Sequence, residues 1–430
     1  MKNNDDPARL FIKNRFKLSS NLEPKSAAIL FGADEMPRNG DQFFPFRQNS
    51  DLFYLTGIQQ EKTALILTPG HRDHKMQEIL VILKPSPELE IWNGHKLSIS
   101  EAKEISGIKH VIYEESVDST LSDILSGVEN IYLNKPELPK FLPDVASRDE
   151  RLGKQIMEKF PYHNYKRLAP LLRDLRSVKE PMEADLISEA IKITHKGFQR
   201  VLSKIIPGMN EKEIEAILNY EFLLKGASGF AFPPIVASGK NACFLHYTDN
   251  NRLMEDGELL LMDFGAEYKN YAADISRTIP VNGKFSDRQA ELYDGLLEIF
   301  YRAKEMMKPG VRMEEVHNHV CEMMKTFHTG VGLYSKEDLE RAESEKSLWF
   351  KYYMHGTGHS LGLDVHDYYD KNAVFAPGMV FTCEPGIYIQ DENTGIRLEN
   401  DILITENGNE DLAKDIPIER KEIENLMKKR

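Results

Sequence analysis

Short apolar runs alternate with helical stretches through residues 1–176 of the 430-residue chain. The runs have the length of strands, and Ile99–Ile105 and Val117–Leu125 between them have the pattern of helices. The connection lengths are those usual for an α/β domain. The predicted strands are Thr63–Leu67, Ile79–Leu83, His110–Tyr113 and Asn130–Leu133. This pattern predicts a smaller N-terminal α/β domain.

A strong helix-start signal follows this region. Ser177-Val-Lys-Glu180 has the form of a capping box, and Pro181 stands in the first turn. A long helix is therefore predicted to begin at Ser177. A chain of this length exceeds one ordinary hydrophobic core, so two domains are expected. We place the boundary at this cap, which gives an N-terminal domain at 1–176 and a second domain at 177–430.

From Ser177 onward one order of elements occurs twice. The first copy contains the helix Ser177–Lys204, Pro207-Gly208, a helix capped at Asn210, a strand region with His246, and the pair Asp263 and Asp274. The second copy contains a helix capped at Ser286, Pro309-Gly310, the helix Glu314–His328, His359, and the pair Glu384 and Glu399. Chance rarely produces such an order, so the second domain is predicted to be an internally duplicated α+β domain.

Each copy ends in a predicted strand pair that carries two carboxylates. A turn at Tyr268-Lys269 would place the two aspartates directly opposite each other, and a turn at Asp391-Glu392 would do the same for the two glutamates. Directly opposed residues have Cβ atoms only ~4.5–5.5 Å apart. Like charges that close, in an apolar setting, need a proton or a cation between them. The sequence therefore predicts a metal site.

Each acid alone is more often a capped or salt-bridged carboxylate than a ligand. Arg397 is the structural alternative, because it shares a strand face with Glu399 and can pair with it without a metal. We interpret Arg397 instead as a partner that orients the carboxylate. Four carboxylates and the His359 imidazole form a hard, oxygen-rich donor set. Such a set favours Mn²⁺ or another divalent first-row ion over a structural zinc site, and it has room for two ions.

The segment His355-Gly-Thr-Gly-His359 lacks the glutamate of a zincin helix, and its glycines disfavour a regular helix. It is predicted to be a loop in which one histidine binds metal and the other faces substrate. His246 and His366 stay undecided from spacing alone, since a lone histidine is more often a satisfied polar residue than a ligand. The histidines placed in that structural class are His71, His74, His95, His317, His319 and His328.

The charge balance narrows the class of protein. The formal net charge is −13, and the Lys and Arg residues do not cluster strongly, which argues against nucleic-acid binding. The start of the chain lacks the apolar core of a signal peptide, and no run approaches the ~18 apolar residues of a membrane span. The cysteines Cys243, Cys321 and Cys383 are predicted to be buried, reduced thiols. A cytoplasmic protein without nucleic-acid or membrane partners is expected.

Seven segments of the second predicted domain form a specific set of motifs. They are Leu245-His-Tyr-Thr248, Met262–Tyr268, Ala273–Pro280, His355–Gly362, Asp364-Val-His-Asp367, Glu384-Pro-Gly-Ile-Tyr388 and Gly395–Asp401. As a set they resemble the pita-bread metallopeptidases, the superfamily of creatinase and methionine aminopeptidase. All five ligand positions are intact, which argues against creatinase, where the metal ligands are absent.

Two segments of the first predicted domain refine this resemblance. Phe46–Gly57 and Glu90-Ile-Trp-Asn-Gly94 resemble the N-terminal domain of the Xaa-Pro aminopeptidases (aminopeptidases P), which methionine aminopeptidases generally lack. Trp92 matches a position near a neighbouring subunit's site in that family, so the resemblance implies a homo-oligomer, a dimer or a tetramer. Ser276 stands where threonine is common, and the segment Thr329–Met354 is longer than expected and has no assignment. The Xaa-Pro dipeptidases (prolidases) share nearly every motif and remain the alternative.

The resemblance implies metal-dependent hydrolysis of the N-terminal residue from peptides with proline in the second position. It implies two divalent ions, Mn²⁺ first, with Zn²⁺ or Co²⁺ as alternatives. Asp263 would hold one ion and His359 with Glu384 the other, while Asp274 and Glu399 would bridge them. Glu384 would also take the proton of the attacking water. The residues implied in catalysis or substrate binding are Glu384, His246, His355, His366 and Arg397, with Tyr388 beside Arg397.

Two other classes of protein are disfavoured by the same residues. A catalytically inactive peptide-binding module would not need intact metal ligands, and an ion-storage protein would not need the histidines. Metal content together with a peptidase assay separates the three classes.

Overall fold

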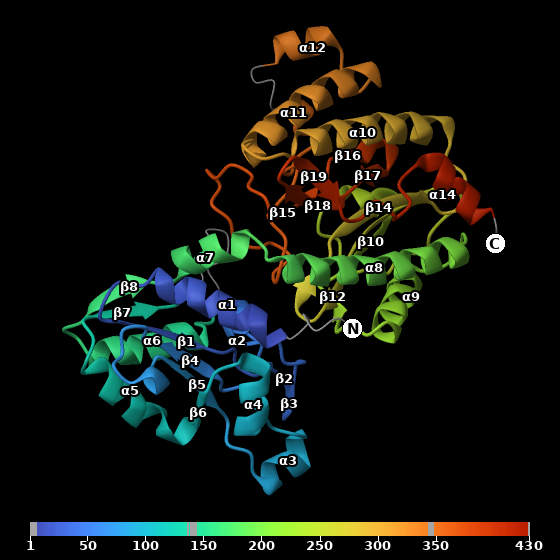
Figure 1. The fold of residues 1–430 in the computed structure, drawn as a ribbon. Coiled ribbons are helices and arrows are strands. Elements are labelled where there is room, and N and C mark those ends of the chain that lie inside the picture. Colours follow the sequence, from blue (N-terminus) through green and yellow to red (C-terminus); the bar gives the residue numbers. More distant parts are fainter. Residues whose placement is uncertain (1–6, 136, 138–143, 343–347, 429–430) are drawn as a thin grey trace. The chain divides into compact units, whose positions relative to one another are not determined.

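The computed structural model describes residues 7–135, 137, 144–342 and 348–428. The chain divides into two compact units, Met1–Arg176 and Ser177–Arg430, and each is described by itself. Figure 1 shows both units as ribbons.

A six-stranded mixed sheet, with strand order β6-β5-β4-β1-β7-β8, forms the centre of the first unit. β1 runs antiparallel to β4 and parallel to β7. The strands are β1 Ser26–Phe31, β4 Ala64–Leu67, β5 Glu78–Ile82, β6 His110–Tyr113, β7 Asn130–Leu133 and β8 Asn164–Arg167, beside the small pair β2 Pro37–Asn39 and β3 Gln42–Phe43. The helices are α1 Pro7–Ser20, α2 Ser50–Thr56, α3 Pro87–Asn93, α4 Ile99–Ser106, α5 Val117–Leu125, α6 Arg148–Lys159 and α7 Ala169–Ser177.

Helices cover both faces of this sheet. Ala27, Ile29 and Phe31 of β1 belong to one buried cluster with side chains of α5 and α6. Successive strand residues point to opposite faces, so Ala28 and Leu30, both fully buried, face the other side, where α2 contacts β1 and β4. The predicted α/β character is thus present, and four of the strands match the predicted ranges to within a residue at each end.

Asp149 is a buried carboxylate in the first turn of α6. It is 4 % exposed, and its Oδ1 accepts a hydrogen bond of 2.7 Å from the backbone N–H of Phe31. Burial, and then the nearby charge of Asp51, raise the pKa of Asp149 to about 8. The native state therefore binds more protons at this site than the unfolded chain between pH 4 and 8, and its contribution to stability falls as the pH rises through that window.

The substitution Asp149→Asn is expected to remove this pH dependence while keeping an oxygen for the Phe31 N–H. The variant should gain free energy of unfolding relative to the wild type between pH 5 and pH 8.5, by a difference of a few kcal/mol. Urea unfolding of the full chain at several pH values measures this difference. A difference that does not change with pH would contradict the assignment.

The described residues of the second unit form four long helices, three three-stranded sheets and one two-stranded sheet. The three-stranded sheets have the orders β10-β11-β14, β13-β12-β9 and β15-β18-β19, and β16 pairs with β17. The helices are α8 Pro181–Lys204, α9 Glu211–Leu224, α10 Asp287–Met306, α11 Met313–Gly330, and the shorter α12 Lys336–Arg341 and α14 Arg420–Met427. The strands are β9 Gly229–Phe230, β10 Ile235–Ser238, β11 Leu259–Phe264, β12 Ala266–Tyr268, β13 Tyr271–Ala272, β14 Ile275–Pro280, β15 Val380–Cys383, β16 Gly386–Ile389, β17 Thr394–Arg397, β18 Asn400–Thr405 and β19 Gly408–Asp411.

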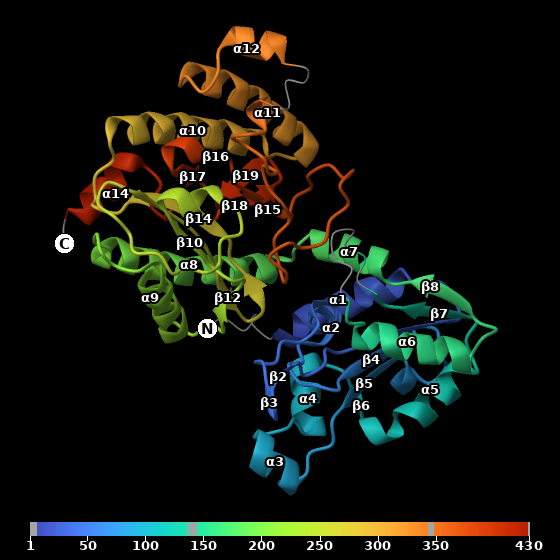
Figure 2. The ribbon, with the colours of Figure 1, turned by 180° about the vertical axis from the view of Figure 1, so that it is seen from behind.

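The order helix, helix, strands occurs twice within this unit. α8 and α9 precede the β10-β11-β14 sheet, and α10 and α11 precede the β15-β18-β19 sheet. Figures 1 and 2 show, from opposite sides, the strands lying between the α8/α9 pair and the α10/α11 pair. The predicted duplicated α+β domain is confirmed.

The predicted start of the first long helix is wrong. Ser177 is the last residue of α7, and α8 begins at Pro181 with Glu180 as its N-cap. The capping box is formed by Glu180 and Glu183, whose side chain accepts the Glu180 N–H at 2.9 Å. A residue before proline is restricted to extended backbone, so Glu180 (φ −69°, ψ 155°) cannot be helical. The helix therefore starts after the predicted cap.

Two further predictions concern cysteines and membrane spans. Cys243, Cys321 and Cys383 are buried and form no disulfide, as predicted. Among the residues that the structure describes, no helix is both long enough and apolar enough to cross a membrane. Of the unassigned segment Thr329–Met354, residues 343–347 lie outside the described residues, and α12 is a short helix within it.

Candidate active site

A cavity of about 330 Å³ in the second unit contains all five predicted metal ligands in its wall. Its other polar wall residues include the three histidines predicted to face substrate, His246, His355 and His366, and also Arg397, which was predicted to orient a carboxylate. One part of the wall is apolar and was not predicted; it consists of Phe232, Pro233, Ile235, Leu245 and Val365. Metal-ligating and apolar groups therefore face the same space.

The first carboxylate pair is held by β11 and β14, but not in the predicted register. Asp263 pairs with Ser276, so Asp274 lies two residues away from the position directly opposite Asp263. The turn falls at Lys269-Asn270, whose φ angles are +47° and +68°, because Tyr268 pairs with Tyr271. The predicted direct opposition of the two aspartates is wrong. A shift of two residues keeps side chains on one face, so the two carboxylates remain neighbours.

The second carboxylate pair has the predicted register. On one side Cys383 pairs with Asn400, and on the other Gly386 pairs with Arg397. Both pairings place Glu384 across from Glu399, at the junction of the β15–β18 and β16–β17 ladders. The two glutamates thus lie between the two ladders and belong to neither, and their side chains line the cavity.

His359 brings the two pairs together. Its Nε2 lies 3.4 Å from Asp274 Oδ2 and 3.8 Å from Glu384 Oε1. Ligand atoms of Asp274, His359 and Glu399 all lie within 4.8 Å of one another, the one such group of three or more potential ligands found among the described residues. The two halves of the duplicated domain therefore contribute jointly to one cluster.

The electrostatics of this cluster favour a bound cation. Burial raises the pKa of Asp274 well above its ordinary value, and the charges of Asp263, Asp401 and Glu384 raise it further. Burial, followed by Asp274 and Glu384, does the same for Glu399. Asp263 Oδ1 is buried and has no hydrogen-bond partner in the described part of the chain. Oxygen-rich donors with uncompensated negative charge fit divalent first-row ions.

Arg397 does not pair with Glu399 directly, which was the structural alternative. Its Nη2 donates to Asp263 Oδ2 at 2.7 Å, and its Nε donates to Ser276 Oγ at 2.8 Å. Ser276 Oγ in turn donates to Glu399 Oε2 at 2.7 Å. One buried guanidinium thereby orients a carboxylate of each pair, and Ser276 has a role that the sequence did not reveal.

His355 belongs to the same hydrogen-bonded network. Arg397 Nη1 donates to the Tyr388 hydroxyl at 3.0 Å, and that hydroxyl lies 2.8 Å from His355 Nε2. The other nitrogen, Nδ1, lies 2.7 Å from the Gly356 carbonyl. Burial, and next the Arg397 charge, lower the pKa of His355 to about 3, so the ring is neutral. A neutral ring with its proton on Nδ1 accepts from Tyr388 and donates to Gly356.

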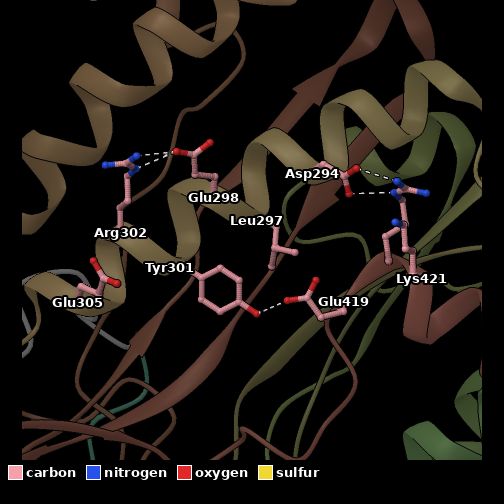
Figure 3. A pocket seen from close by; sticks show the side chains of 9 residues that line it. Asp294, Leu297, Glu298, Tyr301, Arg302, Glu305, Glu419 and Lys421 are labelled. Carbon is pink, nitrogen blue, oxygen red and sulfur yellow. Dashed lines mark hydrogen bonds and ion pairs between the residues drawn. The ribbon is translucent and has the colours of Figure 1, made fainter.

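A larger hollow, of about 640 Å³, lies between α10 and α14 of the same unit, and Figure 3 shows it from close by. Most of its charged groups are engaged with neighbouring side chains. Arg420 pairs with Asp294, Arg302 pairs with Glu298, and the Tyr301 hydroxyl donates to Glu419 at 2.6 Å. None of these groups forms a cluster of ligands among the described residues, so the smaller cavity is the candidate active site.

Comparison with known sequences gives the class of protein. The sequence profile of metallopeptidase family M24 matches residues 185–406, and that of the aminopeptidase P N-terminal domain matches residues 11–132. The first of these covers more than half of the chain. The chain therefore belongs to metallopeptidase family M24.

Individual relatives agree over the whole chain. An Xaa-Pro aminopeptidase of Haemophilus influenzae is 35 % identical, with 98 % of this chain and 97 % of the relative covered. An Xaa-Pro aminopeptidase of Escherichia coli is 35 % identical over 97 % of both chains. Zn-substituted E. coli aminopeptidase P in complex with product superposes with a TM-score of 0.89 at 33 % identity, covering 98 % of each chain.

These similarities confirm the family, the pita-bread fold and the class of enzyme, a metal-dependent aminopeptidase. The family implies divalent metal ions, as expected. The aminopeptidase P type of N-terminal domain favours an aminopeptidase over a dipeptidase. The roles of the individual site residues stay predictions.

Proposed function

We propose that the chain removes the N-terminal residue from peptides whose second residue is proline. The observation that carries this proposal is one cavity in which a metal-binding donor set faces an apolar wall. The donors suit activation of water, and the wall suits a proline ring. A peptide bond before proline has no N–H and a fixed φ, so a dedicated pocket is needed to position it.

Two divalent ions, first of all Mn²⁺, are proposed as the cofactors. We assign Asp263 to one ion, His359 and Glu384 to the other, and Asp274 and Glu399 to both. When bound, such ions polarise the scissile carbonyl and acidify the attacking water. The buried, oxygen-rich donors support Mn²⁺ over a thiolate-type zinc site, with Zn²⁺ and Co²⁺ as alternatives.

Side chains of the protein would then accept the proton and bind the substrate. Glu384 accepts the proton of the attacking water, since its carboxylate lies in the cavity wall beside His355 and His359. His246 and His366 line the cavity and bind the peptide. Burial and the Arg397 charge keep His355 neutral, and its bonds to Tyr388 and Gly356 hold the ring in place. We therefore propose that His355 orients the site rather than transferring protons.

Product analysis separates the proposed activity from that of a dipeptidase. A dipeptidase must recognise the proline carboxylate, whereas an aminopeptidase leaves that end open. Xaa-Pro-Yaa tripeptides and longer peptides are expected to lose only the first residue, and to do so faster than Xaa-Pro dipeptides. Chromatography of the products with added Mn²⁺, at equal substrate concentrations, measures this.

The matched control peptide has alanine in place of proline. Its cleavage should be slowed strongly, because the pocket is shaped for the ring and its fixed φ. Cleavage of dipeptides with tripeptides untouched would establish the prolidase alternative instead.

We further propose a cytoplasmic homo-oligomer, a dimer or a tetramer. Ile91 and Trp92 of α3 are 79 % and 87 % exposed, and large apolar side chains that protrude in this way are common at interfaces between subunits. Three buried free thiols agree with a reducing compartment. Light scattering of the purified chain gives the subunit number, and a monomer at all concentrations would contradict the assembly.

A further inference from the structure

The part of the cavity wall that carries His246 is a loop with little support from the sheets. This loop, residues 244–252, is called the His246 loop here. It follows the short 3₁₀ helix Gly239–Cys243 and contains no strand. Leu245, His246 and Thr248 line the cavity, while Phe244 at the start of the loop is 57 % exposed. The conformation of the loop must therefore be set by specific contacts.

A single buried carboxylate supplies several of these contacts. Glu211, the first residue of α9, is fully buried. Its Oε1 accepts the backbone N–H and the hydroxyl of Ser238, both at 2.7 Å, where β10 ends. Its Oε2 accepts the Tyr247 hydroxyl at 2.7 Å and the Arg252 backbone N–H at 2.9 Å. Both oxygens are thus satisfied by the strand before the His246 loop and by the loop itself.

Tyr247 connects Glu211 to the middle of the loop. The far end is tied separately, because the Asn250 side chain accepts from Val236 N and donates to the Pro234 carbonyl, both at 2.9 Å. The Tyr247 ring packs on the buried cluster that contains Ile235 and Tyr388. The hydroxyl bond to Glu211 therefore fixes the residue next to His246, while the ring supplies separate packing.

We propose that Glu211 is a positioning residue for the substrate, because through Tyr247 it fixes the His246 loop against the cavity. The inference rests on the proposed function and on His246 as a substrate contact. Glu211 touches neither the cavity nor the metal ligands. Its loss should weaken substrate binding while the metal site and the chemical step remain intact.

The test is Tyr247→Phe, which keeps the ring and removes the hydroxyl with its bond to Glu211; the longer contacts of this hydroxyl with Asn251, at 3.2 and 3.3 Å, lie within the same loop and are lost with it. For an Xaa-Pro-Yaa tripeptide we expect KM to rise about tenfold, the scale of one lost hydrogen bond to a carboxylate. We expect kcat to stay within about twofold, as for loss of uniform binding, and metal content to be unchanged. Glu211→Gln, which loses acceptor capacity for several donors, should raise KM at least as much.

The matched control is Tyr301→Phe, which removes an equivalent bond, from a tyrosine hydroxyl to Glu419, in the hollow of Figure 3. This variant should leave KM and kcat unchanged. In a His246→Ala background, Tyr247→Phe should add little to KM, because both changes act on one contact.

Three results would overturn the positioning role, and a fourth would reject the proposed function. An unchanged KM in Tyr247→Phe, or fully additive effects with His246→Ala, would overturn the positioning role. A fall in kcat together with lost metal would overturn it too, since Glu211 would then support the metal site. A wild type that does not cleave Xaa-Pro peptides would instead reject the proposed function itself.

Discussion

Asp274→Asn is expected to abolish peptidase activity and to lower the content of bound metal, while the protein stays folded. Asp274 is 4 % exposed and lies 3.4 Å from His359, and its backbone N–H donates to Asp401. Asparagine preserves this shape but removes one negative charge and one ligand oxygen of full basicity. Metal analysis and a tripeptide assay on the same sample measure both effects.

The metal-free forms provide a second measurement. Without a cation, Asp274 crowds buried like charges, and the pKa of this carboxyl is raised well above its ordinary value by burial and by those charges. Metal-free Asp274→Asn should therefore unfold at no lower temperature than the metal-free wild type, whereas added Mn²⁺ should stabilise the wild type more. Asp149→Asn, at a buried carboxylate far along the chain from the site, is the control and should retain its metal. Full activity of a thoroughly metal-stripped wild type would contradict the two-ion site.

The two strand pairs show where the sequence was sufficient. For Glu384 and Glu399 the turn fell where it was expected, and the register matched. For the aspartates the turn moved by one residue, because Lys269 and Asn270 adopt positive φ and Asn is one of the residues that tolerate it. Moving a turn by one residue shifts the register by two, which keeps the side-chain face. The gathering of the four carboxylates around one cavity was therefore predictable even where their pairing was not.

Arg397 shows what sequence spacing alone does not settle. It shares a strand face with Glu399, and direct pairing was a reasonable alternative. In the structure, Ser276 lies between Arg397 and Glu399. The Arg397 guanidinium donates instead to Asp263, a residue 134 positions away in the chain. Strand spacing predicts which face a side chain lies on, but it does not predict contacts between separate strand pairs.

Local sequence patterns also did not predict the residues that form and support the rest of the cavity wall. From the sequence, Glu211 is simply the first residue of a capped helix. Its carboxylate accepts hydrogen bonds from residues 27 to 41 positions further along the chain, namely Ser238, Tyr247 and Arg252, and no local pattern predicts these contacts. Phe232 and Pro233 read as an ordinary loop. Only the three-dimensional structure shows that these two residues line the cavity between the two duplicated halves.

Glu384→Gln is expected to lower kcat by roughly 10²–10⁴, the usual scale for loss of a general base, and further if metal is also lost. The backbone N–H of Glu384 donates to the Thr357 carbonyl at 2.8 Å, which fixes the residue in either variant. Its carboxylate lies 3.8 Å from His359 and 3.7 Å from His355. Burial raises the pKa of this carboxyl above its ordinary value when no metal is bound. Glutamine has the same shape but cannot take up the proton.

The variant must be compared with one that changes charge without touching the cavity. Glu392→Gln, in the turn between β16 and β17, removes a partly exposed carboxylate that pairs with Arg288, and should leave kcat unchanged. Steady-state kinetics and metal content are measured for both variants, so that loss of the base is separated from loss of the ion. A Glu384→Gln enzyme that keeps its metal and a near-normal kcat would move the base elsewhere. His355 would be the next candidate, and it would then have to release the hydrogen bond from Tyr388 or the one to Gly356, because both of its ring nitrogens are engaged.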